Sequence, residues 1–324
     1  MVRRVDRYPP GPMRVLLLVN STASSVTPRK RANIRKILSS AHDVEVAETS
    51  RRGHATLLAQ AAAEDDFDVV AVLAGDGTLN EAAAGLLHTR TALAPLPGGS
   101  TNVYSATLGY PRHASDAAEA LLGALERQSL RRVGVGMADD RPFLFCAGVG
   151  FDAAVIRRVE RHSRWVKRVA SHPLHIAAAV HSFFSTEGRR THVHVDVEDG
   201  PNLSNVRFAI VSKATPYTHL GRLPLNIARN VSIDTRLSLD AFTKLSALTL
   251  VGGAASSIRT GKFLASRKDV VALDDLGKIH VYSDTPFPYQ VDGDDAGDTL
   301  ELHMAFAPDA LAVAIPLGGP TVLP

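Results

Sequence analysis

Short apolar runs alternate with helix-like segments through roughly the first 140 residues. The apolar runs are MRVLLLVN, DVVAVLA and ALAPL, and the more polar VEVAE lies between the first two. Apolar residues recur with a helical period in residues 28–40, 54–66, 78–87 and 115–128, and a short helix is expected near Asn102. Strands that are apolar throughout and separated by helices are typical of a parallel sheet covered on both faces. The pattern therefore predicts an α/β, Rossmann-like nucleotide fold.

The pattern changes after about residue 142. Shorter runs follow, often alternating between apolar and polar residues and separated by turn residues: THVHVDVE, VRFAIVSK, KIHVYSD, FPYQVD and TLELHMA. Such runs indicate an antiparallel, all-β region. Helix-like patterns interrupt it at residues 152–185 and 243–257.

A chain of 324 residues is long enough for about two domains. We predict an α/β nucleotide-fold domain over residues 13–140 and an antiparallel β domain over residues 141–305. Residues 306–324 are expected to return to the first domain.

The composition is that of a globular protein without membrane spans or an internal disulfide. Hydrophobic residues make up 45% of the chain and charged residues 21%, which is typical of a globular protein, and no apolar run approaches a membrane span. The single cysteine, Cys146, excludes an internal disulfide and fits a reducing compartment. We expect a cytoplasmic protein.

The 13 histidines show no H-x-x-x-H spacing, so His192 and His194 are expected to be a surface pair and not a zinc site.

Glycine-rich segments follow the apolar runs where ligands bind in parallel sheets, beyond the carboxyl ends of the strands. Gly75-Asp76-Gly77-Thr78 ends one run, and PLPGGSTNVYSATLG repeats the design one strand later. Glycines allow close backbone approach, and a following helix presents free N–H groups to phosphate. Asp76 either holds a cation that accompanies the phosphate or caps the helix. Hydroxyl residues of Asn20–Ser24 offer a third loop.

Two further charged segments leave alternatives open. Composition alone favours a solvated acidic turn for Asp292, Asp294, Asp295 and Asp298. The basic segment RRVERHSRWVKR, residues 157–168, places its arginines on one face of a helix. That face either attracts an anionic membrane surface or is the solvated side of a core helix. No reader motif for nucleic acid accompanies it, so we expect no nucleic-acid partner.

Several motifs together resemble the diacylglycerol kinase catalytic-domain superfamily, which includes sphingosine and ceramide kinases. AGDGTLNE is similar to its GGDGT signature, ETSRRGHATLLA to its T-x-x-x-G-H-A segment, and LPGGSTNVYSATLG to its P-x-G-T-x-N-D segment. CAGVGFDAAV is similar to G-F-D-A-x-V, and PYQVDGDD to the closing D-G-E. The resemblance implies an α/β domain related to NAD kinases and phosphofructokinases, joined to a β-sandwich. It also implies transfer of phosphate from ATP, with Mg²⁺, to a lipid hydroxyl.

The resemblance also implies roles for individual residues. Asp294 matches the catalytic carboxylate, with Asp where the family has Glu; Asp292 supports it, and Asp76 organises Mg²⁺. Asp234 matches a structural magnesium site of bacterial members, with backbone carbonyls from Val231 and Arg236. The implied ATP-binding residues are Asn20, Ser21, Thr22, Ala23, Ser24, Thr49, Gly75, Asp76, Gly77, Thr78, Leu79, Asn80, Glu81 and Ser100.

The resemblance favours diacylglycerol as acceptor, with a sphingoid base or ceramide as the alternative. An NAD kinase shares GGDGT, and a relative that binds nucleotide or lipid without catalysis is a further alternative. The implied partners are a lipid alcohol and an anionic membrane surface that the protein contacts peripherally. Homodimer formation is expected by analogy with bacterial members.

Overall fold

The computed structural model divides into two compact units, residues 1–135 with 307–324 and residues 136–306. It describes residues 11–23, 25–150, 192–214, 218–220, 223–225, 231–243 and 270–319. The helix predicted over residues 152–185 lies outside the described residues, as does the helix predicted over residues 243–257 except for Thr243. No helix within the described ranges has both the length and the apolar character needed to span a membrane.

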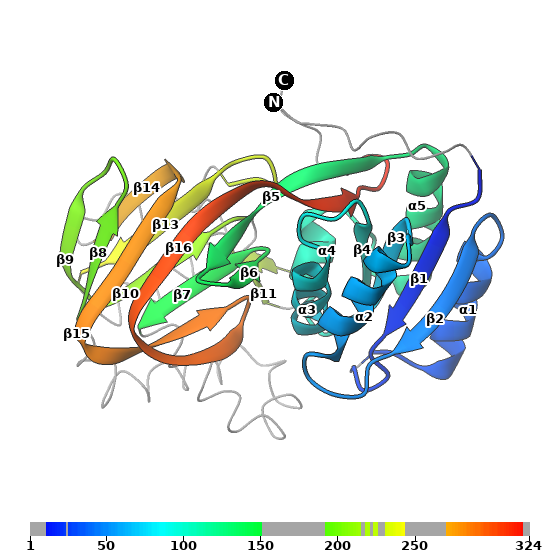
Figure 1. Cartoon of the computed structure of the whole chain (residues 1–324), viewed down its shortest axis with the longest axis horizontal. Coiled ribbons are helices and arrows are strands. Elements are labelled where there is room, and N and C mark those ends of the chain that lie inside the picture. Colours follow the sequence, from blue (N-terminus) through cyan, green and yellow to red (C-terminus); the bar gives the residue numbers. More distant parts are fainter. Residues whose placement is uncertain are drawn as a thin grey trace. The chain divides into compact units, whose positions relative to one another are not determined.

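The first unit is built on a parallel sheet (Figure 1). Its strands are β1 (Arg14–Val19), β2 (Asp43–Glu48), β3 (Val69–Ala74) and β4 (Ala92–Pro97), in the order β4-β3-β1-β2. Every residue of β3 and β4 is buried, as expected for strands covered on both faces. The last part of β16 (Asp294–Ala314) joins this sheet in parallel with β4, with Val313 opposite Leu93. The predicted α/β fold is therefore confirmed for this unit.

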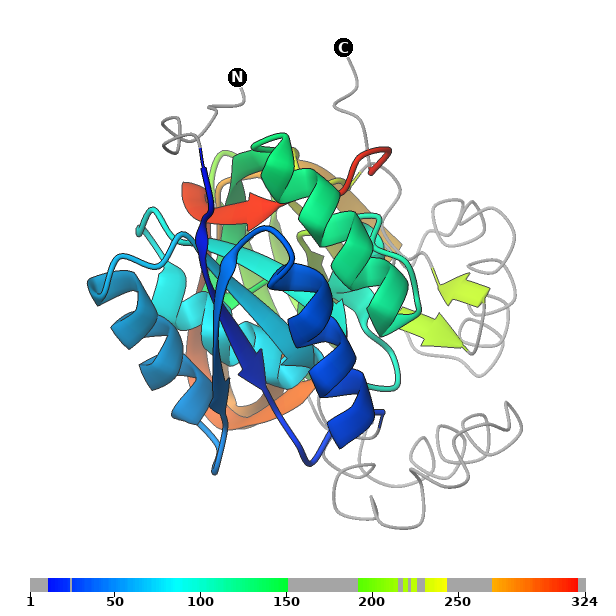
Figure 2. The ribbon, with the colours of Figure 1, turned by 90° about the vertical axis from the view of Figure 1, so that its right-hand side faces the viewer.

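Helices cover both faces of this sheet (Figure 2). Helices α2 (His54–Glu64) and α3 (Asp76–Leu86) pack together on one face, and α1 (Pro28–Leu38) and α5 (Ala114–Glu126) pack together on the other. The short α4 (Val103–Thr107) follows β4. This arrangement follows from right-handed crossovers between parallel strands, because the chain reverses its direction of travel across the sheet after β2.

The second unit consists of antiparallel strands (Figure 1). They are β6 (Arg141–Phe143), β7 (Cys146–Gly150), β8 (Val193–Val197), β9 (Asn202–Val206), β10 (Phe208–Ser212), β11 (Thr218–Leu220), β12 (Leu223–Leu225), β13 (Leu237–Phe242), β14 (Val270–Leu276), β15 (Lys278–Val291) and the first part of β16. The strand β5 (Leu130–Ala138) leads into β6.

The long strand β15 belongs to two antiparallel groups. Its first half pairs with β8, which pairs with β9, and its last residues pair with β7 in the row β14-β13-β10-β7. The β15–β16 register shifts between Tyr282 and Phe287, where the strand passes from one group to the other. Inward side chains of both groups share one hydrophobic cluster, among them Val195, Val211 and Leu239. The two groups enclose one core and are continuous through β15, an arrangement that fits the predicted β-sandwich.

Gly85 in α3 allows the close packing of α3 on α2, which we predict is sensitive to a single methyl group. A Cβ at residue 85 would overlap the carbonyl oxygen of Thr56 and lie 3.0 Å from the Gln60 nitrogen. Gly85→Ala should therefore lower the free energy of unfolding of the first unit, by about 1–3 kcal/mol, measured by urea unfolding.

Gly123→Ala in α5 is the matched control. Its Cβ would meet only Leu317 Cδ1, at 3.9 Å, so the higher helix propensity of alanine should leave stability unchanged or raised. Equal destabilisation by both substitutions would contradict this account of the helix contact.

Candidate active site

The loops that follow β1, β3 and β4 meet at one edge of the first unit. These strands are parallel neighbours in the order β4-β3-β1, so their carboxyl ends lie side by side. The backbone connects the loops directly, because Asn20 N donates to Leu73 O at 3.3 Å and Ser25 N donates to Gly98 O at 3.2 Å. The first unit therefore brings the three predicted loops together at the edge where ligands bind in parallel sheets, and the nucleotide site there stays a prediction.

Two of these loops touch through glycine backbones. A Cβ on Gly99 would lie 2.7 Å from Gly75 Cα, and a Cβ on Gly98 would lie 2.7 Å from Ala74 N. Both distances are shorter than any real Cβ contact, so only glycine allows this approach. Asn102 fixes the second loop: its Oδ1 accepts from Gly99 N at 2.8 Å, and its Nδ2 donates to Gly99 O at 3.0 Å. It does so from a left-handed backbone conformation, with φ of 49°.

Asp76 begins α3 and links it to the loop after β4. Its Oδ2 accepts a hydrogen bond from Thr101 Oγ1 at 2.9 Å, and its Oδ1 accepts one from Tyr104 N at 3.3 Å. The residue that caps α3 is Gly75, which has no side chain to bond the free amides of the first turn. Asp76 is therefore not the residue that caps α3. Its half-buried carboxylate instead joins the start of α3 to the loop after β4.

Asn20 organises the first loop. Its Nδ2 donates to Thr78 Oγ1 at 2.9 Å, and its Oδ1 accepts from Thr22 N at 3.0 Å and Thr22 Oγ1 at 2.7 Å. Ser21 and Thr22 are exposed, and Ala23 is half-buried. Thr49 lies next to this loop, because its N donates to Val19 O at 2.9 Å. Ser24 lies outside the described residues.

The other residues predicted to bind the nucleotide differ in how far they are buried. Gly75, Asp76, Gly77 and Thr78 are half-buried at the edge, and Ser100 is exposed in the second loop. Leu79 and Asn80 are buried in the first unit. Glu81 bonds to the start of α2: its Oε2 accepts from Ala55 N at 3.4 Å and its carbonyl oxygen from Thr56 Oγ1 at 2.8 Å. Thr101, Asn102 and the Tyr104 amide are contacts at this edge that the motif comparison did not single out.

The acidic turn predicted in the second unit is the tight hairpin between β15 and β16. Asp292 and Gly293 both have positive φ, 49° and 82°, as a two-residue hairpin turn requires. The Asp292 side chain is buried and accepts three backbone hydrogen bonds, from Leu144 N at 2.7 Å and from Phe145 N and Cys146 N at 3.0 Å each. Asp292 is therefore a structural anchor between the hairpin and β7.

Asp294 faces differently from Asp292. Its side chain is 29% exposed, and its Oδ2 accepts a hydrogen bond from Arg141 Nη2 at 3.0 Å. Arg141 lies on β6, 153 positions away in sequence, and no local pattern pointed to it. The Asp294 carboxylate is therefore partly accessible and paired with Arg141.

The loop around Asp234 binds the ammonium group of a lysine side chain of the protein, Lys213. Lys213 is buried, and its ammonium donates to Ile233 O at 3.0 Å and Ser232 O at 3.4 Å. Burial lowers the pKa of Lys213 to about 8, and the nearby Asp234 acts in the opposite direction. A divalent ion beside this ammonium would meet like charge, so the loop as it stands does not favour magnesium. The ion predicted at Asp234, Val231 and Arg236 stays a prediction.

Comparisons with known proteins agree with the geometry of the first unit. Residues 14–137 match the family model for the diacylglycerol kinase catalytic domain. This segment belongs to the diacylglycerol kinase catalytic-domain family. Over 94% of its length the chain also resembles the crystal structure of a diacylglycerol kinase from Bacillus anthracis, 98% of which is covered, with a TM-score of 0.71 and 20% identity. At that identity the likeness concerns the fold, and it confirms the predicted two-part architecture.

Two curated relatives each match less than half of the chain. A protein of Chromohalobacter salexigens named "Probable lipid kinase YegS-like" is 35% identical over 142 residues, which are 43% of this chain and 44% of that protein. The diacylglycerol kinase of Bacillus subtilis is 31% identical over 120 residues, which are 36% of this chain and 38% of that enzyme. The chain therefore spans less than half the length of the curated relatives that it matches.

We predict that the Asp292 anchor carries much of the stability of the second unit. In Asp292→Asn an amide NH₂ replaces one of the acceptor oxygens that face three N–H groups. The free energy of unfolding should fall by about 2–3 kcal/mol, measured by urea unfolding at neutral pH. Asp298→Asn, an exposed acid of the same segment, should change stability by less than about 0.5 kcal/mol. Equal effects of the two substitutions would show that Asp292 is not an anchor.

Proposed function

We propose that this protein transfers the γ-phosphoryl group of ATP to the hydroxyl group of a lipid, with diacylglycerol as the favoured acceptor. The observation that carries the proposal is the meeting of three loops at the carboxyl edge of β1, β3 and β4, within the segment that matches the diacylglycerol kinase catalytic domain. The names of the matched relatives support a lipid as acceptor.

The triphosphate would bind to backbone amides of the three loops. Helix α3 has 11 residues, and its first amides have no side-chain cap, so its N-terminus offers free N–H groups and the positive end of its dipole. The glycine contact between the loops after β3 and β4 removes side chains that would fill the phosphate position. The exposed Ser21 and Ser100 add hydroxyl donors around it, whereas the Thr22 hydroxyl already donates to Asn20 Oδ1.

The same edge suits a magnesium ion that accompanies ATP. Side-chain donors there are oxygens, from Asp76, Thr78 and Ser100, and magnesium prefers oxygen ligands and keeps several waters. When bound, the ion neutralises charge on the phosphates during transfer. Asp76 would hold it, and the bonds from Thr101 and Tyr104 N keep the Asp76 carboxylate in place.

Asp294 is proposed as the group that accepts the proton of the lipid hydroxyl. Its carboxylate is accessible and is oriented by Arg141, whereas the buried Asp292 is already bonded to three amides. Phosphoryl transfer requires positioning and charge stabilisation more than covalent chemistry, so the direction of this carboxylate matters as much as its presence.

We further propose that the protein meets its acceptor at an anionic membrane surface. The basic face predicted for residues 157–168 supports this idea from the sequence; those residues lie outside the described part of the structure.

The direct test is transfer of labelled phosphate from ATP and Mg²⁺ to diacylglycerol, sphingosine and ceramide in mixed micelles, with NAD as a soluble acceptor. We expect the wild-type protein to label a lipid. Asp294→Asn should lower kcat by about 10²- to 10⁴-fold with little change in KM for ATP, because a general base contributes on that scale. Arg141→Ala should lower kcat less, since the carboxylate remains but loses its partner.

Asp298→Asn is the control for charge in that segment and should keep full activity. Labelling of NAD alone, or ATP binding with no labelled acceptor, would contradict the lipid kinase proposal. A fully active Asp294→Asn variant would remove Asp294 from the mechanism and leave the kinase proposal standing.

A second prediction concerns Asn102, which holds the loop after β4. Asn102→Ala removes both bonds to Gly99 and places alanine in a left-handed conformation, so KM for ATP should rise about tenfold. Asn102→Gly keeps the backbone conformation accessible and should raise KM less. Kinetics at varied ATP would show this order, and an unchanged KM in both variants would mean that the loop does not bind ATP.

A further inference from the structure

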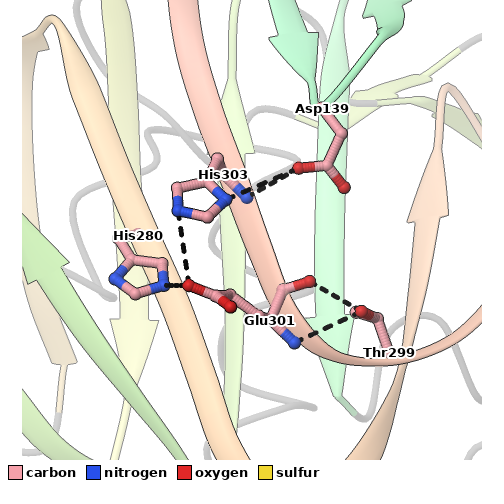
Figure 3. Close-up of polar contacts among 5 residues, drawn as sticks. All are labelled: Asp139, His280, Thr299, Glu301 and His303. Carbon is pink, nitrogen blue, oxygen red and sulfur yellow. Dashed lines mark hydrogen bonds and ion pairs between the residues drawn. The ribbon is translucent and has the colours of Figure 1, made fainter.

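A second cluster of polar side chains lies in the second unit, on the face of the strands that points away from the core (Figure 3). In the β15–β16 register His280 stands directly opposite His303, and Glu301 precedes His303 by two positions on the same strand. Alternate residues of these strands, Ile279, Val281, Leu302 and Met304, are buried in the core. Strand alternation therefore places His280, Glu301 and His303 together on the outer face.

Three donor atoms converge in this cluster. Glu301 Oε1 lies 2.8 Å from His280 Nε2 and 3.4 Å from His303 Nε2, and all three ligand atoms lie within 4.8 Å of one another. The two imidazole rings are stacked, with centroids 4.4 Å apart and planes 4° apart. Figure 3 shows both rings directed toward the Glu301 carboxylate.

The contact of His280 with Glu301 does not have hydrogen-bond geometry. His280 Nε2 is buried and makes no hydrogen bond within the described residues, although Glu301 Oε1 lies 2.8 Å away. A buried ring nitrogen that makes no hydrogen bond is costly, and in the tautomer whose lone pair faces the carboxylate the two atoms repel each other. A cation bound between the nitrogen and the oxygen would remove both costs.

The spacing fits a tetrahedral ion with nitrogen and oxygen ligands. With metal–ligand bonds of about 2.0–2.2 Å, two ligands of a tetrahedral zinc ion lie roughly 3.3 Å apart. The distance of 3.4 Å between His303 Nε2 and Glu301 Oε1 matches this spacing, and the 2.8 Å contact of His280 needs to open by about half an ångström. Imidazole ligands suit zinc and its transition-metal neighbours rather than magnesium.

Asp139 provides the outer support that metal-bound histidines usually have. It lies in the turn between β5 and β6, and its Oδ1 accepts from His303 N at 3.0 Å and lies 3.8 Å from His303 Nδ1. The Asp139 N donates to His303 O at 2.8 Å, so the two residues are held together by backbone as well. This carboxylate lies 3.8 Å from His303 Nδ1, the ring nitrogen that faces away from Glu301, and a closer approach on metal binding would fix the tautomer of the ligand.

We propose that His280, Glu301 and His303 form a zinc site that joins β15 to β16, with water completing the coordination. Asp139 is the positioning residue of this site. The site is independent of the proposed kinase reaction. Its two imidazole ligands favour zinc over the magnesium that ATP requires.

The test is a calorimetric titration of the full chain, without a polyhistidine tag, with Zn²⁺ in buffer that contains millimolar Mg²⁺. We expect one Zn²⁺ per chain and a rise in the unfolding midpoint when zinc is present. Glu301→Gln and His303→Gln should weaken binding by more than about 100-fold, and Asp139→Asn by about 10- to 100-fold, as for other outer-shell partners. Cobalt bound in place of zinc should give the visible absorption of a tetrahedral site.

His194→Gln is the matched control. His194 lies on the neighbouring strand β8 and stacks on Tyr282 of β15, but it is not one of the three ligands. It should bind zinc like the wild-type protein. Absence of a Zn²⁺ binding event, or equal affinity in Glu301→Gln, His303→Gln and wild type, would overturn the proposal. Circular dichroism of the metal-free variants checks that each is folded, so that lost binding reports lost ligands.

Discussion

The arrangement of the candidate nucleotide site depends on a contact between two glycine backbones. Gly75 follows β3 and Gly99 lies in the loop after β4, and a Cβ on Gly99 would lie 2.7 Å from Gly75 Cα. Because no side chain separates these loops, the Asp76 carboxylate reaches both Thr101 Oγ1 and Tyr104 N. A larger residue at this contact would part the loops and break these bonds. The chemistry proposed for the edge is therefore set first by sterics and only then by charge.

The second unit shows how neighbouring acids in one turn acquire different roles. Asp292 lies in the hairpin turn, is buried and bonds to three amides, whereas Asp294 begins β16 and remains accessible beside Arg141. The Asp292 oxygens are buried and already accept three backbone amides, so a substrate hydroxyl has no access to them. Asp294 is partly exposed, which is why the proposed mechanism uses Asp294.

Much of the fold was predictable from local patterns, and contacts between distant strands were not. Buried runs such as VVAVLA predicted the parallel sheet, because strands covered on both faces must be apolar throughout. KIHVYSD and FPYQVD read as separate strands because the register shift between Tyr282 and Phe287 interrupts the alternation within β15. The Arg141–Asp294 pair and the His280–Glu301–His303 cluster depend on strand register, which no short stretch of sequence encodes.

The claim that three loops bind the triphosphate is tested most directly by hydrogen exchange of backbone amides with and without ATP and Mg²⁺. The account predicts slower exchange in residues 20–25, 75–80 and 98–104, with most other amides of the first unit unchanged. These segments contain the loops that meet at the carboxyl ends of β1, β3 and β4. Protection that appears elsewhere, or that spares all three loops while ATP is bound, would contradict the account.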